Sequence, residues 1–351
     1  MTDEHFMRRA LELAENGRYT VSPNPMVGCV IVRDGAILAE GWHRRAGEAH
    51  AEVDALSRCE NARGATMYVT LEPCAHHGRT PPCAPAVVAS GVSRVVIAMG
   101  DPNHQVDGRG IEQIRAAGIE VVTGIGEAEA RRQNEKFLWS TTQKLPFILL
   151  KAAMTLDGKL ATAARDSQWI TTEAAREKSL ALREECDAIL VGGGTIKADN
   201  PRLSRRLKLS ETPWTRVVLD GDGEVPPHAQ VLVDGGRTIL FTSSPPLDRA
   251  PGLEVITTDG RTDLQRVFGE LYARGIRSVL VEGGALVHSE LIARELWQKM
   301  VIFVAPMVVG GHEAPAIFTG PPAMRLTDAH RFRFDRAEFV GRDLMIVAYP
   351  A

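Results

Sequence analysis

The sequence predicts a protein of two α/β domains. At 351 residues the chain exceeds the usual size of a single domain. Segments with strand-like and helix-like patterns alternate along both halves, which indicates sheets covered by helices. Residues 141–146 are polar and end at a proline, as a linker does. We therefore expect one domain over residues 1–144 and a second over residues 145–351.

The first half is predicted to hold a mixed sheet that begins with a hairpin. A helix over 5–16 carries its apolar residues on one face. Two apolar runs, 29–32 and 36–40, flank Asp34-Gly35, a dipeptide typical of tight hairpin turns. The other expected elements are helices over 50–59, 84–90, 109–117 and 127–139 and strands over 66–70, 95–98 and 119–123.

The second half repeats the alternation of strands and helices without an initial hairpin. Strands are expected over 147–153, 188–192, 216–219, 238–242, 254–257, 278–282 and 300–304, with a C-terminal pair over 333–339 and 344–349. Helices are expected over 172–185, 262–273 and 285–296. We find no internal repeat and no low-complexity tract.

Composition and charge narrow the functional class. The chain has 41 basic and 44 acidic residues, interspersed, so its net charge is −3 and no basic patch for nucleic acid or anionic membrane is expected. No apolar run approaches the roughly 18 residues of a membrane span. The N-terminus opens with Asp3 and Glu4, so no signal peptide is expected. Five cysteines, an odd number in a long chain, argue against a secreted disulfide scaffold. We expect a cytoplasmic enzyme.

Four residues of the first half have the spacing of a catalytic zinc site. His50, Cys74 and Cys83 offer one imidazole and two thiolates, a set that suits Zn²⁺ and leaves a fourth position for water. An H-x-E followed by P-C…C is the zinc-deaminase signature, in which the glutamate moves protons and does not bind metal. We expect one zinc per chain and Glu52 as the catalytic acid and base. His76 and His77 remain alternative ligands, whereas Cys29 and Cys186 have the pattern of core residues.

The loop that carries the two cysteines resembles the deaminase half of the bifunctional riboflavin-biosynthesis deaminase–reductases. Its sequence is Thr70-Leu71-Glu72-Pro73-Cys74-Ala75-His76-His77-Gly78-Arg79-Thr80-Pro81-Pro82-Cys83. Eight residues separate its cysteines, whereas most cytidine and tRNA deaminases have two. The resemblance implies a cytidine-deaminase-like αβα domain with a mixed sheet. It also implies a phosphoribosylated diaminopyrimidinone as the substrate, deaminated at its ring amino carbon. The implied substrate contacts are Asn24, His43, Arg79, Asp101 and Asn103.

Two glycine clusters in the second half each follow a strand, and the second cluster also precedes an expected helix. Gly192-Gly193-Gly194 and Gly283-Gly284 could face a phosphate with free backbone N–H groups. With residues 151–159 and 167–171, these blocks resemble the reductase half of the same family. That resemblance implies a dihydrofolate-reductase-like α/β fold and NADPH as cofactor. The implied cofactor contacts are Ala153, Trp169, Thr171, Thr195, Asp199, Gly283 and Gly284, and the implied substrate contacts are Ser167, Arg183, Leu203, Arg206 and Glu282.

The sequence leaves several residue roles and the overall assignment open. Lys151 and Glu282 are both candidates for the general acid of the reduction. Arg183 and Arg206 suit a ribose phosphate, and neither position is expected to need a cation for folding. Alternatives to the whole assignment are a nucleoside or tRNA deaminase with an unrelated appended domain, and a structural-zinc protein without turnover. The expected partners are the small-molecule substrate and further copies of the chain in a homo-oligomer, without nucleic acid or membrane.

Overall fold

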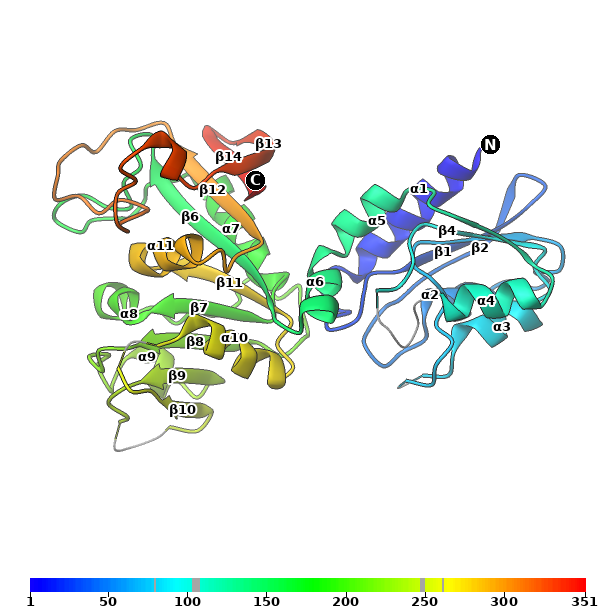
Figure 1. The fold of residues 1–351 in the computed structure, drawn as a ribbon, viewed down its shortest axis with the longest axis horizontal. Coiled ribbons are helices and arrows are strands. Elements are labelled where there is room, and N and C mark those ends of the chain that lie inside the picture. Colours follow the sequence, from blue (N-terminus) through cyan, green and yellow to red (C-terminus); the bar gives the residue numbers. More distant parts are fainter. Residues whose placement is uncertain (79, 103–107, 247–249, 261) are drawn as a thin grey trace. The chain divides into compact units, whose positions relative to one another are not determined.

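The computed structural model describes residues 1–351 except 79, 103–107, 247–249 and 261 (Figure 1). Contacts divide the chain into two compact units. The first contains Met1–Lys144 and Ser210–Thr212, and the second contains Leu145–Leu209 and Pro213–Ala351. Each unit is built around one sheet. Among the described residues, no helix has the length and apolar character needed to cross a membrane.

The first unit contains a five-stranded mixed sheet in the order β2-β1-β3-β4-β5. Its strands are β1 (Gly28–Arg33), β2 (Ala36–Trp42), β3 (Thr66–Val69), β4 (Arg94–Ile97) and β5 (Glu120–Thr123). β1 is antiparallel to β2 and β3, and the remaining pairs are parallel. Asp34 and Gly35 both have positive φ, 53° and 79°, as a two-residue hairpin turn of type I′ requires. The predicted hairpin and mixed sheet are confirmed.

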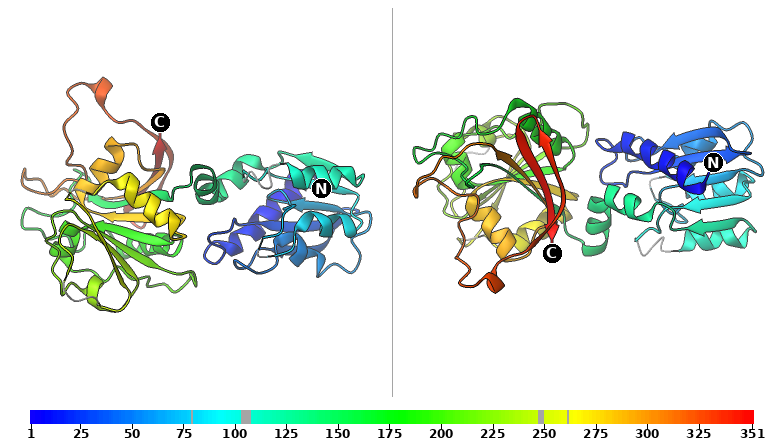
Figure 2. Two further views of the ribbon diagram at one scale, coloured as in Figure 1. Left: turned by 60° about the horizontal axis from the view of Figure 1, so that its bottom comes forward. Right: turned by 90° about the horizontal axis from the view of Figure 1, so that it is seen from above.

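Helices cover both faces of this sheet. They are α1 (Asp3–Ala14) with a 3₁₀ turn over Glu15–Gly17, α2 (Ala51–Leu56), α3 (Cys83–Ala89), α4 (Arg109–Ala116), α5 (Glu127–Gln133) and α6 (Glu135–Gln143). Gly28 and Gly41 lie on opposite faces, because Gly41 pairs with Cys29. A Cβ at Gly28 would lie 1.9 Å from Ala10 O in α1, and one at Gly41 would lie 2.4 Å from Ala55 N in α2. The two glycines therefore let the helices approach from opposite sides, which makes an αβα sandwich (Figure 2).

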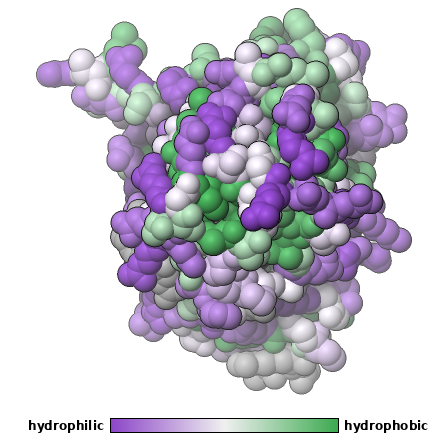
Figure 3. Space-filling view, turned by 90° about the vertical axis from the view of Figure 1, so that its right-hand side faces the viewer, coloured by the Kyte–Doolittle hydropathy of each residue, from purple (hydrophilic) through white to green (hydrophobic). Residues whose placement is uncertain are grey.

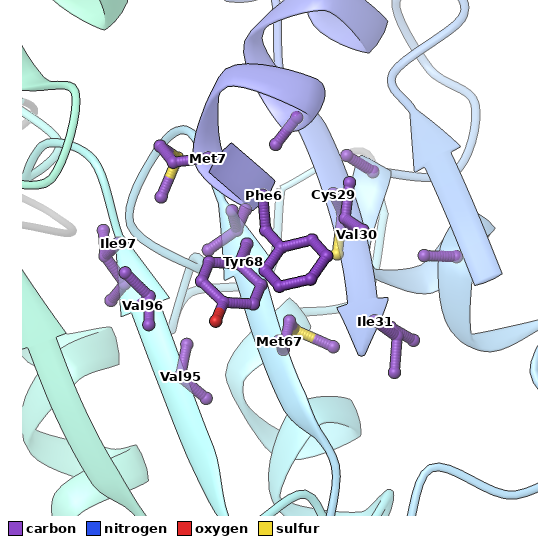
Figure 4. Packing of buried hydrophobic residues seen from close by; sticks show 14 of the residues in the cluster. Phe6, Met7, Cys29, Val30, Ile31, Met67, Tyr68, Val95, Val96 and Ile97 are labelled. Carbon is purple, nitrogen blue, oxygen red and sulfur yellow. The ribbon is translucent and has the colours of Figure 1, made fainter. Parts of the chain in front are cut away.

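Part of the core of the first unit lies between α1 and the central strands. Phe6 packs 5.2 Å from Tyr68 of β3, ring centre to ring centre, and Met7 is buried beside them. Figure 4 shows these side chains against the apolar residues of β1 and β4. Cys29 is fully buried, as is Cys186 in the second unit, so both are core residues as expected. In the surface view of Figure 3, hydrophilic side chains surround smaller apolar areas, the usual exterior of a folded protein.

The C-terminal end of the first unit differs from the predictions at two places. The expected helix over 127–139 is two helices, α5 and α6, because Asn134 leaves helical geometry and turns its side chain to another segment. The expected linker over 141–146 is wrong at its start, because α6 continues to Gln143. Its last turn is polar because residues 142 and 143 face solvent. The chain leaves the helix at Lys144, where φ is 57°.

The second unit contains a nine-stranded sheet in the order β10-β9-β8-β7-β11-β6-β12-β14-β13. Its strands are β6 (Phe147–Thr155), β7 (Ala188–Gly192), β8 (Thr215–Asp220), β9 (Thr238–Thr242), β10 (Leu253–Thr257), β11 (Ser278–Gly283), β12 (Lys299–Ala305), β13 (Phe332–Val340) and β14 (Asp343–Pro350). The seven strands from β10 to β12 are parallel, and β14 and β13 add an antiparallel edge. Every strand predicted for this half is present.

Helices again lie on both faces. They are α7 (Glu173–Glu184), α8 (Gly193–Asp199), α9 (Gln230–Val233), α10 (Leu264–Ala273) and α11 (Ala285–Ala293), with a 3₁₀ turn over Leu326–Asp328. Leu190 of β7 packs with α10 and α11, whereas its neighbour Ile189 packs with α8 and α9. The sequence did not predict α8 and α9, since α8 begins in a glycine run of low helix propensity and α9 is a single turn. The predicted α/β class is confirmed for both units.

Candidate functional site

Three metal-ligand atoms converge in the first unit. His50 directly precedes α2, Cys74 lies in the loop after β3, and Cys83 is the first residue of α3. Their ligand atoms lie within 4.8 Å of one another. His50 Nδ1 is 3.2 Å from Cys83 Sγ and 3.5 Å from Cys74 Sγ, while the Thr80 hydroxyl is 3.1 Å from His50 Nε2. One nitrogen and two sulfurs on one side of the imidazole make a donor set that fits Zn²⁺.

The loop between the two cysteines brings the second sulfur back to the first. Pro81 and Pro82 precede Cys83, and Pro82 is extended at the start of α3. The Cys83 N–H donates to Cys74 Sγ at 3.3 Å, and the Ala84 N–H donates to the Cys74 carbonyl at 3.1 Å. Hydrogen bonds from Cys83 and His50 lower the pKa of the Cys74 thiol, which favours the thiolate that binds metal. His76 lines the pocket described next and lies outside the three-ligand group.

Glu52 stands beside the ligands in the first turn of α2. It is 3% exposed, and this burial raises its pKa to about 6. The H-x-E spacing explains the placement, because the helix starts between His50 and Glu52 and turns both toward the same space. A carboxyl group with a pKa near neutrality can accept a proton and return it, as general acid–base catalysis requires.

His50, Cys74 and Glu52 line one pocket of about 310 Å³. Asn24, His43 and Asp101, three of the predicted substrate contacts, line the same pocket. Asn24 Nδ2 is 3.0 Å from His43 Nε2, and His43 Nδ1 is 3.0 Å from the Ala49 carbonyl, so these two side chains hold each other in position. Burial lowers the pKa of His43. Arg79 and Asn103, the other two predicted contacts, lie outside the described residues.

Two buried side chains that support this pocket had no predicted role. Asn134 accepts the Met26 N–H at 2.7 Å and donates to the Met26 carbonyl at 2.9 Å, across 108 residues of sequence. It thereby fixes the loop that carries Asn24. Glu72 accepts several backbone N–H groups near Asp101. Glu72 lies inside the stretch that carries the family resemblance, whereas nothing in the sequence around Asn134 marks it.

In the second unit, residues predicted to contact the cofactor gather where β7 and β11 end. These strands are parallel neighbours, so their carboxyl ends share one edge of the sheet. A Cβ at Gly283 would lie 2.7 Å from Thr195 Oγ1, so the end of β11 and the start of α8 are in direct contact. Gly284 has a φ of 87° and precedes α11, whose N-terminus has no side-chain cap. The open N–H groups of this nine-residue helix are suited to an anion.

The other predicted cofactor contacts are spread along the chain around this edge. Ala153 lies near the end of β6, and Asp199 is the last residue of α8. Trp169 is 63% exposed, with the Arg176 guanidinium 4.6 Å from its ring centre. Thr171 is buried, and its carbonyl accepts a hydrogen bond from Arg176.

The predicted substrate residues of this unit include an ion pair with little solvent exposure, because its two side chains are only 13% and 10% exposed. Arg183 Nε and Nη2 donate to the two Glu282 oxygens at 2.9 and 2.7 Å, and Arg183 Nη1 donates to the Ser204 carbonyl at 3.0 Å. Burial alone would raise the pKa of Glu282, but the charges of Arg183, Lys151 and Arg206 lower it to about 2. The expectation that position 183 needs no cation for folding is therefore wrong, because a buried carboxylate without a partner is strongly destabilising.

The remaining predicted substrate residues differ in exposure. Arg206 is exposed, and Ser167 is partly exposed in the segment before α7. Leu203 is buried in the apolar cluster under α8 and α9, and its carbonyl accepts the Trp214 indole N–H at 2.9 Å. Its side chain therefore takes part in the core.

Comparison with known proteins identifies both halves. The cytidine and deoxycytidylate deaminase zinc-binding region matches residues 1–99, and the RibD C-terminal domain matches residues 146–346. The riboflavin biosynthesis protein RibD of Bacillus amyloliquefaciens is 42% identical, covering 99% of this chain and 96% of that protein. RibD of Escherichia coli K12 is 40% identical, covering 99% of both chains.

Solved structures agree with the sequence relatives. The Thermotoga maritima diaminohydroxyphosphoribosylaminopyrimidine deaminase/5-amino-6-(5-phosphoribosylamino)uracil reductase superposes with a TM-score of 0.91 at 39% identity, covering 99% of this chain and 98% of that one. Acinetobacter baumannii RibD gives a TM-score of 0.90 at 36% identity, covering 99% of each chain. The predicted resemblance and the two predicted fold types, cytidine-deaminase-like and reductase, are confirmed. With full-length relatives and matching domains in both halves, the chain belongs to the RibD family of riboflavin biosynthesis proteins.

Proposed function

We propose that the chain performs two consecutive steps of riboflavin synthesis. Residues 1–144 deaminate 2,5-diamino-6-(5-phosphoribosylamino)pyrimidin-4-one, and residues 145–351 then reduce the ribosyl group of the product to ribityl with NADPH. The observation that carries this proposal is the convergence of His50, Cys74 and Cys83 at a pocket that His50, Cys74 and Glu52 line, in a chain whose other half matches the RibD C-terminal domain. That match also disfavours a nucleoside or tRNA deaminase with an unrelated appendage.

In the deaminase half, His50, Cys74 and Cys83 would hold one zinc ion. When bound, zinc supplies Lewis acidity that makes water a better nucleophile. Glu52 accepts a proton from the attacking water and delivers it to the amine that leaves. Its buried carboxyl, with a pKa of about 6, supports both transfers. Asn24, His43 and Asp101 orient the substrate from the pocket wall, and Arg79 and Asn103 are proposed to contribute as well.

In the reductase half, the edge formed by Thr195, Gly283 and Gly284 would hold NADPH. Ala153, Trp169, Thr171 and Asp199 complete the proposed cofactor contacts. NADPH supplies the hydride, and the chain orients it against the sugar carbon that bears the amine. Ser167, Arg183, Leu203, Arg206 and Glu282 are proposed to form the substrate side. The exposed Arg206 adds positive charge suited to a ribose phosphate, whereas the Arg183 guanidinium is paired with Glu282.

The test is incubation of the protein with the diaminopyrimidine nucleotide, with and without NADPH, followed by mass analysis and an ammonia assay. Without NADPH, we expect ammonia and a product in which oxygen replaces one amino group. With NADPH, that product should gain two hydrogens. Ammonia release without any NADPH-dependent product would contradict the second half of the proposal, and no ammonia from zinc-loaded protein would contradict the first.

We propose a cytoplasmic location and a homo-oligomeric state on separate grounds. All five cysteines are free, which fits a reducing compartment.

The edge strand β13 exposes Phe334 and Phe339, at 71% and 79%. The register shift between Phe334 and Arg336 turns both aromatic side chains to the same face of the sheet.

Antiparallel pairing of two copies of β13 would continue the sheet. We therefore expect Phe339→Ser to lower the mass measured by light scattering during size-exclusion chromatography, relative to wild type. A monomeric wild-type protein would contradict the proposal.

A further inference from the structure

Glu72 is a buried carboxylate at the start of the loop that carries Cys74. It is 3% exposed and follows β3 closely. Its Oε2 accepts the backbone N–H groups of Asp101 at 3.3 Å and Gly108 at 3.1 Å. Its Oε1 accepts those of Gly110 at 3.0 Å and Ile111 at 3.2 Å, in the first turn of α4. An ionised carboxylate offers about four acceptor positions, and the protein backbone occupies all of them.

Within the described residues, no lysine, arginine or histidine forms an ion pair with Glu72. Its charge is balanced by the N–H groups of α4 and of Asp101, at the positive end of the helix. A buried charge held only by backbone groups is costly if any of those groups moves. The backbone around Asp101 and the start of α4 is therefore tied to the position of this one side chain.

The same contacts connect Asp101 to the metal-binding loop. A Cβ at Gly110 would lie 1.9 Å from the carbonyl oxygen of Pro73, the residue between Glu72 and Cys74. The start of α4 thus packs directly on the backbone that leads to Cys74. Glu72 and Asp101 both line the pocket.

We propose that Glu72 is a positioning residue for the deamination: its carboxylate fixes the backbone at Asp101 relative to the loop that carries Cys74. The substrate contact and the metal ligand thereby keep a constant position relative to each other. This inference rests on the proposed deaminase function. Because its oxygens are already occupied by backbone N–H groups, Glu72 acts through Asp101 and contributes no proton to the reaction. The misplacement of a recognition group by about 1 Å can cost on the order of 10²-fold in rate.

The test compares Glu72→Gln with Glu112→Gln, which removes an exposed carboxylate from the first turn of the same helix, α4. Glutamine keeps one oxygen but turns an NH₂ group toward two backbone N–H donors, so two of the four hydrogen bonds are lost. We expect Glu72→Gln to lower kcat/KM for deamination by about 10- to 100-fold, mainly through a higher KM. Zinc content should stay near one per chain, and reduction of the deaminated substrate should be unchanged. Glu112→Gln should match wild type.

A purely structural role would give a different result: zinc content and kcat per total protein would fall together, with KM unchanged. That outcome, or wild-type kinetics in Glu72→Gln, would overturn the proposal. If Glu72→Gln does not fold, the KM of Glu72→Asp tests the proposal instead, because aspartate retains the charge but has a shorter side chain. A higher KM in folded Glu72→Asp supports the inference, whereas an unchanged KM, or unfolding of both variants, overturns it. Absence of ammonia release by wild type and Glu112→Gln would instead refute the deaminase function itself.

Discussion

Two glutamates with little solvent exposure, one in each unit, have pKa values shifted in opposite directions. Burial raises the pKa of Glu52 to about 6. The Glu282 side chain is 10% exposed, yet the cations around it, above all Arg183, lower its pKa to about 2. Desolvation acts on both side chains in the same sense, so the neighbouring cations decide the difference. Glu52 is thereby suited to exchange protons near neutral pH, whereas Glu282 is held as a carboxylate.

The opposite pKa shifts correspond to different contributions of the protein to the proposed chemistry of the two halves. In the deaminase half, the proposed acid and base belongs to the protein, so its pKa must lie near the working pH. In the reductase half, the proposed cofactor carries the hydride, and the protein contributes orientation and a balanced set of charges. Substitutions at these two sites should therefore affect different quantities.

We expect the strongest effect from His50→Ala, which should abolish one activity and leave the other intact. His50→Ala removes the only nitrogen of the three-ligand group, so we expect zinc to be lost and deamination abolished. NADPH oxidation with the already deaminated substrate should stay near wild type. The measurements are zinc content, ammonia release and NADPH oxidation, with circular dichroism as the control for folding. Loss of both activities in a folded variant would show one composite site in place of two.

The next effect tests the role of Glu52 against that of the ligands. Glu52→Gln removes the proton acceptor but keeps the shape of the side chain, so deamination should fall by about 10²- to 10⁴-fold. Zinc content should stay close to one per chain, whereas Cys83→Ser should lose metal. An empty site in Glu52→Gln would identify Glu52 as a ligand and would contradict the proposed role.

The third prediction concerns Glu282 and acid stability. Its folded-state pKa of about 2 lies below the ordinary value of 4.5, so its ionised form stabilises the folded state. That contribution is complete above the ordinary pKa and is lost as the pH falls from about 5 to 2; its size is about 3 kcal/mol. The free energy of unfolding of Glu282→Gln should therefore decline less steeply over this range than that of wild type. The exposed Glu295→Gln in the same unit is the control, and equal pH slopes in all three proteins would contradict the assignment.

The smallest effect concerns Arg206, the exposed cation near Glu282. If it binds the substrate phosphate, Arg206→Ala should remove a charge-assisted hydrogen bond worth about 1.5–3 kcal/mol. That corresponds to about a 10- to 150-fold loss of kcat/KM in the reductase reaction. Arg206→Lys should recover part of the loss, because an ammonium cannot reproduce the two-pronged contact of a guanidinium. Weaker NADPH binding with an unchanged substrate KM would place Arg206 on the cofactor side.

The α/β class, the strands and the group of His50, Glu52, Cys74 and Cys83 could all be predicted from the amino-acid sequence. These features depend on neighbours along the chain: apolar runs predict strands, Asp34-Gly35 predicts a hairpin, and a helix start sets the spacing of His50 and Glu52. Their signals are local, so they can be read without coordinates.

The partners of side chains that are distant in sequence could not be predicted, because tertiary packing sets them. Arg183 pairs with Glu282 across 99 residues, and Asn134 holds Met26 across 108. Glu72 lies in a recognisable motif, but its backbone partners at Asp101 and α4 become visible only when the helix packs on Pro73. Such contacts follow no periodicity, because they depend on how strands and helices pack and on which buried charges and amides then require a partner.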